Sequence, residues 1–449
     1  MQSLDQAAAN RPSLSCPASA TPSTELAERV MSRVSRRLLG FLFLLFMFSF
    51  LDRINIGFAG AAMSRDLGLS AAAFGMANTV FYAVYIACGI PSNLMLERFG
   101  ARRWIAILVV AWGVASTSTL FARDEASLYL LRMLVGITEA GFLPGMLLYI
   151  ARWFPSQHRS RANALFMIAM PVTATLGSVV SGFLLELNGT FGLHGWQWLF
   201  LVEGLPCVVL GVVAWHRLDD SPQRARWLSD DEKCVLEALL ARDREAAAQA
   251  TGGAGGRWFS AGTLRLAVIY FCMVTSMGMV NIWGPQMIAG FSQGAGNVVT
   301  GFLVAVPQVA TVLAMLWLGA HSDRRGERRW HTCAPMAIGA LGWLAAAFLP
   351  SPALQLLGIS LASAGAFGAM TVFWAFADQN LSSSAKVVGI AFINAFGNAA
   401  TIVSSLMVGV LKDHTQSFAA GIGYAAALLL VGAVLVLGGA HARRNALHA

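Results

Sequence analysis

Residues 50–59 read Phe50-Leu51-Asp52-Arg53-Ile54-Asn55-Ile56-Gly57-Phe58-Ala59, in the middle of an apolar segment that runs from about residue 38 to residue 62. A segment of this length predicts a membrane-spanning helix. A charge at the centre of a bilayer costs at least about 2.5–3.5 kcal/mol and is kept where it faces a polar cavity or another charge. We therefore expect Asp52 and Arg53 to lie in a functional site inside the membrane.

The composition is that of a helical protein with many membrane spans. Of the 449 residues, 57% are hydrophobic and 12% are charged, whereas soluble domains carry about 25% charged residues. The apolar stretches are continuous rather than alternating, which argues against a β-barrel. The six cysteines form no CxxC pair and are expected to pack as small apolar residues. We find no P-loop and no histidine spacing typical of a metal site, so we expect no enzyme, cofactor or metal and no use of ATP.

We count twelve apolar segments in two groups of six. They are expected at about 38–62, 74–96, 104–121, 127–150, 164–186 and 197–216, and at about 264–289, 298–319, 332–349, 353–376, 386–410 and 418–440. The predicted organisation is a tail (1–37), a six-helix half (38–216), a linker (217–263), a second six-helix half (264–440) and a short tail (441–449). The linker carries an acidic run that suggests a short amphipathic helix, followed by a flexible glycine-rich stretch.

The basic residues indicate the orientation in the membrane. If the N-terminus is cytoplasmic, the outside loops hold only Arg65, Arg123 and Lys412, and nearly all of the other 28 Lys and Arg lie in inside loops and tails. This asymmetry predicts that both termini are cytoplasmic and that the first segment is retained rather than cleaved. It also accounts for the net charge of +8 without a nucleic-acid partner.

A charged loop motif occurs twice, once in each half. It reads Glu97-Arg98-Phe99-Gly100-Ala101-Arg102-Arg103 after the second segment and Asp323-Arg324-Arg325-Gly326-Glu327-Arg328-Arg329 after the eighth. Either copy alone could be an ordinary basic loop, but two copies in register indicate a duplication. Glycine permits the turn, and the acid and arginines can form ion pairs that close and open the inside face. The expected gating residues are Glu97, Arg98, Gly100, Arg102, Asp323, Arg324, Gly326 and Arg328.

These loops resemble the signature of the major facilitator superfamily. Other motifs resemble its anion:cation symporter family, in the bacterial branch of tartrate, phthalate, 4-hydroxyphenylacetate and nicotinate permeases. They are Leu51–Ala59, Glu139-Ala140-Gly141-Phe142-Leu143-Pro144-Gly145, Trp153-Phe154-Pro155, Gly195–Phe200 with Glu203-Gly204-Leu205-Pro206, and His321–His331. The resemblance spans about residues 38–440. It implies an all-α membrane protein of twelve helices in two six-helix halves, which takes up organic carboxylates with protons.

Four charged residues form the expected centre of the site. Arg132 and Glu139 lie seven residues apart, about two helical turns, and so face the same side. The resemblance implies that Asp52 and Glu139 carry protons and that Arg53 and Arg132 meet the substrate anion. Two alternatives stay open: Asp52 and Arg53 could form a structural ion pair, and Arg132 could extend to the membrane interface.

Uncharged residues are expected to line the rest of the cavity. The resemblance implies this for Tyr85, Trp374 and Asn398. Asn394 and Asn398 are four residues apart and share a helix face, so they could instead hold helices together. Because the second half has no deep Lys or Arg, we expect the first half to bind the charged group of the anion. We expect the second half to contact the rest of the substrate.

The predicted protein is a monomeric, multi-pass transporter of the bacterial inner membrane. Its partners are a small organic anion, protons and the lipid bilayer. Two alternatives use the same fold: a proton-coupled efflux antiporter for a metabolite or drug, and a membrane sensor that does not transport. The sequence does not separate symport from the exchange of two anions.

Overall fold

The computed structural model describes residues 24–250, 260–292, 294–381 and 386–447, and within these ranges every regular element is a helix. The first group consists of α2 (Thr24–Leu67), α3 (Ala71–Phe99), α4 (Ala101–Ser118), α5 (Glu125–Glu139), α6 (Phe142–Trp153), α7 (Ser156–Glu186) and α8 (Gly195–Arg217). After α9 (Asp230–Ala250) come α10 (Ala261–Gly278), the π-helical turn η4 (Met279–Trp283), α11 (Gly284–Phe291), α12 (Gly296–Arg325), α13 (Arg329–Phe348), α14 (Pro352–Asn380), α15 (Lys386–Thr415) and α16 (Ala419–Leu447). Single 3₁₀ turns lie at Thr119–Phe121, Thr190–Gly192 and Pro222–Arg224.

The expected twelve membrane-spanning helices are confirmed, since the described residues contain twelve helices long and apolar enough to cross a bilayer. Two spans are interrupted, which the hydrophobic pattern alone did not predict. The span expected at 127–150 consists of α5 and α6, separated by Gly141 in a left-handed conformation with φ of 82°. A Cβ atom on Gly141 would lie 2.3 Å from the Ser92 Oγ, so glycine also lets α3 approach closely.

Helix α2 begins earlier than expected. Residues 24–37, which the sequence assigns to a polar tail, continue the first membrane-spanning helix without a break. The buried side chains of Val30, Met31 and Val34 belong to the same apolar cluster as Leu236 and Leu240 of α9. This packing explains why a charged segment is helical.

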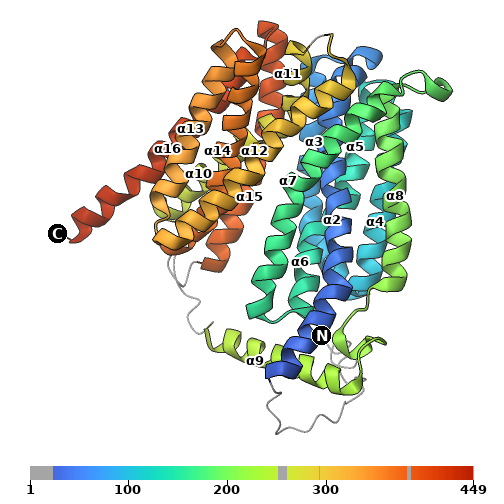
Figure 1. Ribbon diagram of the computed structural model, residues 1–449, viewed down its shortest axis with the longest axis vertical. Coiled ribbons are helices and arrows are strands. Elements are labelled where there is room, and N and C mark those ends of the chain that lie inside the picture. Colours follow the sequence, from blue (N-terminus) through green and yellow to red (C-terminus); the bar gives the residue numbers. More distant parts are fainter. Residues whose placement is uncertain (1–23, 251–259, 293, 382–385, 448–449) are drawn as a thin grey trace.

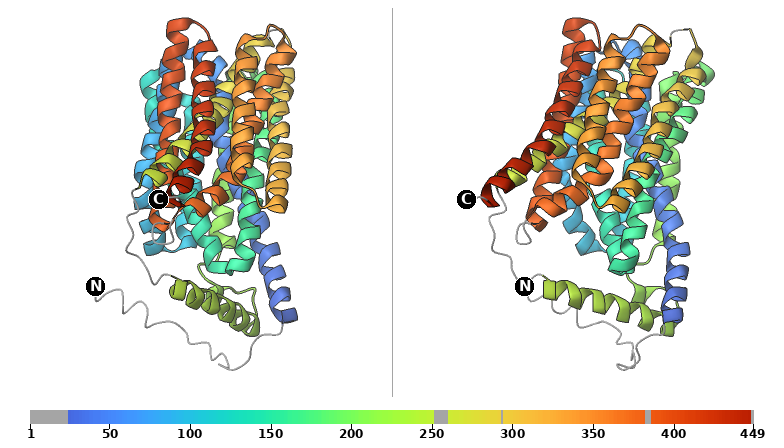
Figure 2. Two further views of the ribbon diagram at one scale, coloured as in Figure 1. Left: turned by 90° about the vertical axis from the view of Figure 1, so that its left-hand side faces the viewer. Right: turned by 60° about the vertical axis from the view of Figure 1, so that its left-hand side comes forward.

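Polar contacts also bind α9 to the first half. Arg33 Nη1 donates to Glu232 Oε1 over 2.7 Å. The Asp243 carboxylate accepts from the Ser156 backbone N–H (3.2 Å) and from Arg159 Nη2 (3.0 Å), at the start of α7. Figure 2 shows α9 lying across the end of the bundle, beside the start of α2.

The two halves meet at the end of the bundle opposite α9, which we call the closed end (Figure 1). There α3 packs against α15 and α7 against α12. A Cβ atom on Gly75 would lie 2.3 Å from the Ser405 carbonyl oxygen, and one on Gly182 would lie 3.2 Å from the Gly301 Cα. Small residues thus bring helices of opposite halves into backbone contact, as is common in membranes.

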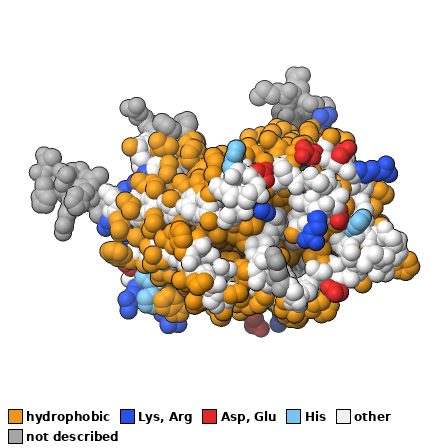
Figure 3. All heavy atoms as spheres, turned by 90° about the horizontal axis from the view of Figure 1, so that it is seen from above, with side chains coloured by type: hydrophobic (Ala, Val, Ile, Leu, Met, Phe, Trp, Pro, Cys, Tyr) orange, Lys and Arg blue, Asp and Glu red, His pale blue; other side chains and the backbone are white. Residues whose placement is uncertain are grey.

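Polar contacts also cross between the halves at the closed end. Asp413, near the end of α15, accepts hydrogen bonds from the backbone N–H groups of Ala71 (2.9 Å) and Ala72 (2.7 Å), the first residues of α3. Asn297 of α12 donates to Glu186 of α7 over 3.2 Å. Figure 3 shows this face, where acidic and basic side chains are scattered among hydrophobic and uncharged ones.

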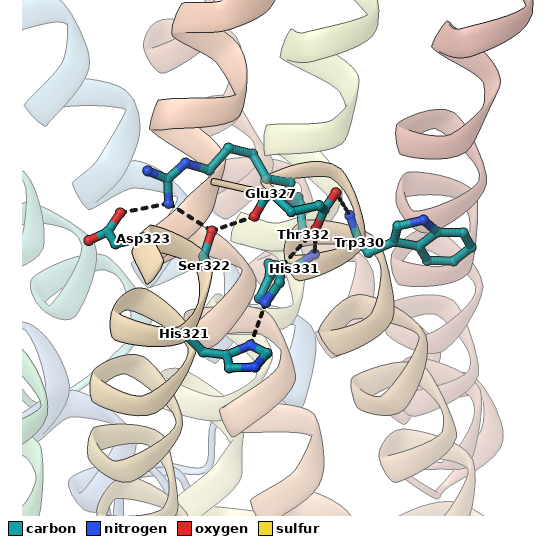
Figure 4. A network of polar contacts seen from close by, with 8 residues as sticks. His321, Ser322, Asp323, Glu327, Trp330, His331 and Thr332 are labelled. Carbon is teal, nitrogen blue, oxygen red and sulfur yellow. Dashed lines mark hydrogen bonds and ion pairs between the residues drawn. The ribbon is translucent and has the colours of Figure 1, made fainter. Parts of the chain in front are cut away.

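Toward α9 the halves diverge, and we call this the open end (Figure 1). The second copy of the charged motif lies here (Figure 4). Arg328 forms an ion pair with Asp323 over 2.6 Å. Glu327 accepts hydrogen bonds from the backbone N–H groups of Trp330 (2.7 Å) and His331 (3.2 Å) and thereby caps α13. Gly326 ends α12 in the left-handed conformation, with φ of 64°.

The first copy of the motif is bound to α8 and the residues after it. The Arg102 backbone N–H donates to Asp220 Oδ1 (3.0 Å), and Arg102 Nε donates to the Trp215 carbonyl oxygen (2.7 Å). Gly100 has a φ of 86°, and a Cβ atom there would meet the Asp220 carboxylate at 2.6 Å. The contacts of Arg102 therefore reach only α8 and the start of the linker, and the ion pair of Arg328 with Asp323 stays within the second half. Glu97, Arg98 and Arg324 are exposed.

Candidate functional site

An ion pair between α2 and α5 forms the centre of the candidate site. Arg53 Nε donates to Glu139 Oε1, which also accepts a hydrogen bond from Ser49 Oγ over 3.0 Å. The Glu139 side chain is fully buried, whereas 18% of the Arg53 side chain is exposed. The second oxygen of Glu139, Oε2, has no hydrogen-bond partner in the described part of the chain.

The position of Glu139 follows from the break in its span. It is the last residue of α5, and the chain turns at Ala140 and Gly141 before α6 begins. The motif that produces this turn, with Gly141 and Pro144, is visible in the sequence. An unbroken helix would continue past Glu139 along the same axis, so the break sets what surrounds the carboxylate.

Asp52 points to a different helix from its neighbour Arg53, because adjacent residues on a helix are about 100° apart. It is 2% exposed, and its Oδ1 accepts hydrogen bonds from Ser116 Oγ of α4 and from Asn55 Nδ2 over 3.2 Å. Its Oδ2 has no partner among the described residues. Asp52 and Arg53 therefore do not form the structural pair that the sequence left open.

Arg132 is buried inside the bundle and does not extend to the membrane interface. It is 2% exposed, and its guanidinium carbon lies 4.4 Å from the centroid of the Phe81 ring. No ion pair of Arg132 occurs within the described ranges, and its Nε has no hydrogen-bond acceptor there. A buried cation without an anion is a place where an anionic ligand is stabilised.

Aromatic rings of α3 connect the two arginines. The Arg53 guanidinium carbon lies 4.6 Å from the centroid of the half-buried Tyr85 ring. Tyr85 stacks on Phe81 at 5.9 Å, and Phe81 in turn lies under Arg132. Such cation–π contacts hold guanidinium groups in place without neutralising their charge.

In the second half, Trp374 contacts Tyr270 of α10, and Asn394 and Asn398 lie on α15. The half-buried Trp374 ring lies 5.0 Å from the Tyr270 ring, and Gly397 of α15 packs directly against that ring. Asn398 Nδ2 donates to Asn394 Oδ1 over 3.3 Å, and Asn394 is exposed. The two amides thus bond to each other along α15, rather than fastening α15 to another helix through this bond.

The structure brings five predicted residues together in the first half: Asp52, Arg53, Tyr85, Arg132 and Glu139. Trp374, Asn394 and Asn398 lie in the second half, where Trp374 contacts Tyr270 and the two asparagines contact each other. The sequence did not predict a role for Ser49 or Ser116, which bond the acids, or for Tyr270; only the spacing of Ser49 before Asp52 and Arg53 hints at a shared helix face. No group of three or more His, Cys, Asp and Glu in the described part could hold a metal ion.

The comparison with known families decides the identity of the chain. The family model described as Major Facilitator Superfamily matches residues 42–405. The chain belongs to the major facilitator superfamily. The structure of this chain has the same fold as the xylose transporter XylE from E. coli in an inward open conformation. The TM-score is 0.71 and the sequence identity 15%, and the match covers 91% of this chain and 96% of that chain.

Curated relatives of this superfamily member are transporters and not enzymes. A protein of Agrobacterium vitis named "Putative tartrate transporter" is 38% identical over 92% of each chain. The "Quinolone resistance transporter" of Acinetobacter baumannii is 32% identical over 90% of this chain and 94% of its own. The chain is thus a multi-pass membrane transporter of small organic substrates, as the motifs predicted.

Proposed function

We propose that this superfamily member is a monomeric proton-coupled symporter that takes up an organic carboxylate across the bacterial inner membrane. Both termini are cytoplasmic in this proposal, and the closed end faces outward. Arg65, Arg123 and Lys412, the basic residues expected outside, lie in helix ends and loops at the closed end, which supports this orientation. The relative named as a tartrate transporter supports the class of substrate.

The ion pair between Arg53 and Glu139 carries the proposal. Arg53 is the partly exposed member of the pair, and guanidinium binds a carboxylate through two parallel hydrogen bonds. A substrate carboxylate at Arg53 displaces Glu139, which then keeps only the Ser49 hydroxyl as a partner. An ionised carboxylate that is buried without a cation is costly, so Glu139 takes up a proton. Substrate and proton therefore load together.

The charges of the site support the same coupling. Asp52, Arg53, Arg132 and Glu139 sum to zero when all four are ionised. A bound monocarboxylate makes the sum −1, and one proton restores neutrality before the site crosses the membrane. A dicarboxylate requires more protons. In the second half, Tyr270, Trp374 and the two asparagine amides of α15 supply ring faces and hydrogen bonds for the uncharged part of the substrate.

Alternating access follows from the arrangement of the halves. They contact at the closed end and diverge at the open end, where the two charged loops lie (Figure 1). When the halves rock about the site, the closed-end contacts separate and the open end closes. We propose that the two charged loops then come together and form the inside gate. The loop of the first half contributes Glu97, Arg98, Gly100 and Arg102, and the loop of the second half contributes Asp323, Arg324, Gly326 and Arg328.

The test is uptake by purified protein in proteoliposomes. A panel of labelled carboxylates, from tartrate and sugar acids to phthalate, 4-hydroxyphenylacetate and nicotinate, is offered with and without a pH gradient. We expect one subset to accumulate when the lumen is alkaline, and a protonophore to abolish the accumulation. Accumulation that ignores the gradient would refute proton coupling, and neither transport nor binding of any acid would refute the substrate class.

The variant Glu139→Gln tests the role of the carboxylate. It cannot release a proton, so we expect it to lose uphill uptake and keep counterflow exchange of labelled for unlabelled substrate. The matched control is Asp66→Asn, an acid near the end of α2 whose carboxylate accepts from the Trp196 Nε1 over 2.9 Å, within the first half. Full accumulation driven by the pH gradient in Glu139→Gln would contradict the assignment.

The relative named for quinolone resistance favours a second candidate, a proton-coupled efflux antiporter. The direction of coupling separates the two candidates. An antiporter accumulates substrate in liposomes with an acidic lumen, whereas a symporter requires an alkaline lumen. The same preparation and the same substrate serve both measurements.

A further inference from the structure

A third buried carboxylate, Glu203 of α8, lies beside the site and has no part in the mechanism above. It is 2% exposed; its Oε1 accepts a hydrogen bond from Ser181 Oγ over 3.4 Å, and its Oε2 has no partner in the described part of the chain. It also lines a cavity of about 380 Å³ between α2, α7 and α8, in which the other side chains are apolar apart from Thr173. No cation therefore faces Glu203 from that cavity.

Asn55 connects Glu203 to Asp52. The Asn55 side chain is fully buried, donates to Asp52 Oδ1 over 3.2 Å and lies near the Glu203 carboxyl group. Asp52 and Glu203 are close enough to repel each other when both are ionised. One oxygen of each of the three side chains has no hydrogen-bond partner in the described ranges: Asp52 Oδ2, Asn55 Oδ1 and Glu203 Oε2.

The charge of the first half is unbalanced once Glu203 is counted. Within the described residues, four charged side chains are buried, namely Asp52, Arg132, Glu139 and Glu203. Together with Arg53 they make three carboxylates and two guanidinium groups, a sum of −1. A buried carboxylate in excess of its cations binds a proton rather than staying ionised. Because Arg53 already forms an ion pair with Glu139, we assign the excess negative charge to Asp52 and Glu203.

We propose that Asp52 and Glu203 hold one proton between them in the empty transporter, with Asn55 as the bridge, and that Glu203 is the positioning residue that sets the protonation of Asp52. The inference rests on the proposed proton coupling for its consequence in transport. The charged groups near Asp52 are Arg132 and Glu139 of α5, and the Cys207 thiol lies one turn after Glu203 along α8. In this scheme Glu139 takes up its proton when substrate binds, and Asp52 and Glu203 hold a second proton in the same half.

The first test needs no transport. Infrared difference spectroscopy of purified, substrate-free protein in lipid reports the C=O stretch of protonated carboxylic acids, which is separate from the bands of carboxylates. We expect such a band at neutral pH, loss of the band in Glu203→Gln, and a shifted band in Asn55→Ala because the bridge is removed. A wild-type spectrum without a carboxylic-acid band would overturn the proposal.

The second test is the pH dependence of uptake. With Glu203→Gln, Asp52 no longer shares a proton, so we expect the midpoint of the pH profile to move by about one unit, which corresponds to about 1.4 kcal/mol of interaction. Asn55→Ala removes an N–H donor to the Asp52 carboxylate, so it should move the midpoint in the opposite direction. The double variant should differ from the sum of the two single shifts, because both residues act on the same carboxyl group. Thr173→Val, beside Glu203 in the same cavity, is the matched control and should leave the profile unchanged.

The outcomes separate this inference from the proposed function. A Glu203→Gln variant with an unchanged profile and an unchanged infrared band would show that Glu203 is only structural. Shifts of Asn55→Ala and Glu203→Gln that simply add would refute the shared proton. If wild-type uptake ignores the pH gradient, the proposed function fails, while the infrared experiment still decides the protonation of the pair. If Glu203→Gln does not fold, Glu203→Asp and Asn55→Ala supply the same comparison.

Discussion

The contact of Asp413 with α3 is expected to stabilise the conformation that is closed at the end opposite α9. Its carboxylate accepts two backbone N–H groups at the N-terminus of a helix that belongs to the other half. A side chain that caps a helix in this way contributes typically about 1 kcal/mol, and a negative charge there gains about 0.3–1 kcal/mol from the helix dipole. The contact breaks when the closed end opens, so this free energy favours the closed conformation alone.

Asp413→Asn removes the charge and one acceptor but keeps the size of the side chain. We expect the ratio of the two conformations to fall by about fivefold, which corresponds to about 1 kcal/mol. The assay is the distance distribution between spin labels at Arg123→Cys and Ala353→Cys, exposed positions at the closed end of opposite halves. The background lacks the reactive native cysteines.

Asp66→Asn is the control for this measurement. Asp66 also lies at the closed end, but its partners Trp196 and His194 belong to its own half. It should leave the distance distribution unchanged. If Asp413→Asn leaves the distribution unchanged, or if both variants shift it equally, the contact does not select a conformation and the reasoning is refuted.

Three further predictions follow from single contacts. Gly141→Ala should lower the melting temperature in detergent more than Gly68→Ala does, because both positions have positive φ but only a Cβ at Gly141 would overlap Ser92. Hydrogen bonds from Ser156 lower the pKa of Asp243, so the contact of Asp243 with α7 persists at neutral pH. This contact is lost only as the pH falls through the lowered pKa. The variant Asp243→Asn should therefore show faster hydrogen exchange in α9 at pH 7, after correction for intrinsic rates. Arg132→Lys keeps the charge but loses the planar contact with a ring, so substrate affinity should fall about tenfold in a binding titration.

The number of membrane spans could be predicted because apolar length is a local property of the sequence. The start of α2 could not, since residues 24–37 are charged and become helical through packing of Val30 and Met31 in the cluster that also contains α9. The break at Gly141 could be predicted only in part. Its glycine and proline signals are in the sequence, but hydrophobicity runs across it without a gap.

For the candidate site, residue types at membrane depth identified the charged positions but not their partners. Arg53 and Glu139 are 86 residues apart on different helices, and no local pattern encodes their contact. In the sequence, Glu203 is followed by Gly204 and Pro206, a pattern that is also compatible with a structural or gate residue. Its place beside Asn55 and Asp52 depends on how α8 packs on α2, which only the three-dimensional arrangement gives.

The glycine contacts between the halves have a consequence for the rate of transport. Gly75, Gly182, Gly301 and Gly409 meet backbone of the other half with no side chain interposed. Surfaces of this kind separate without any change of side-chain rotamer. Opening of the closed end should therefore have a low energy barrier at these contacts. The close backbone contact also makes the conformational equilibrium sensitive to single atoms. One added methyl group at Gly75 or Gly409 would clash with the other half when the closed end is shut, and would make no such clash when it is open.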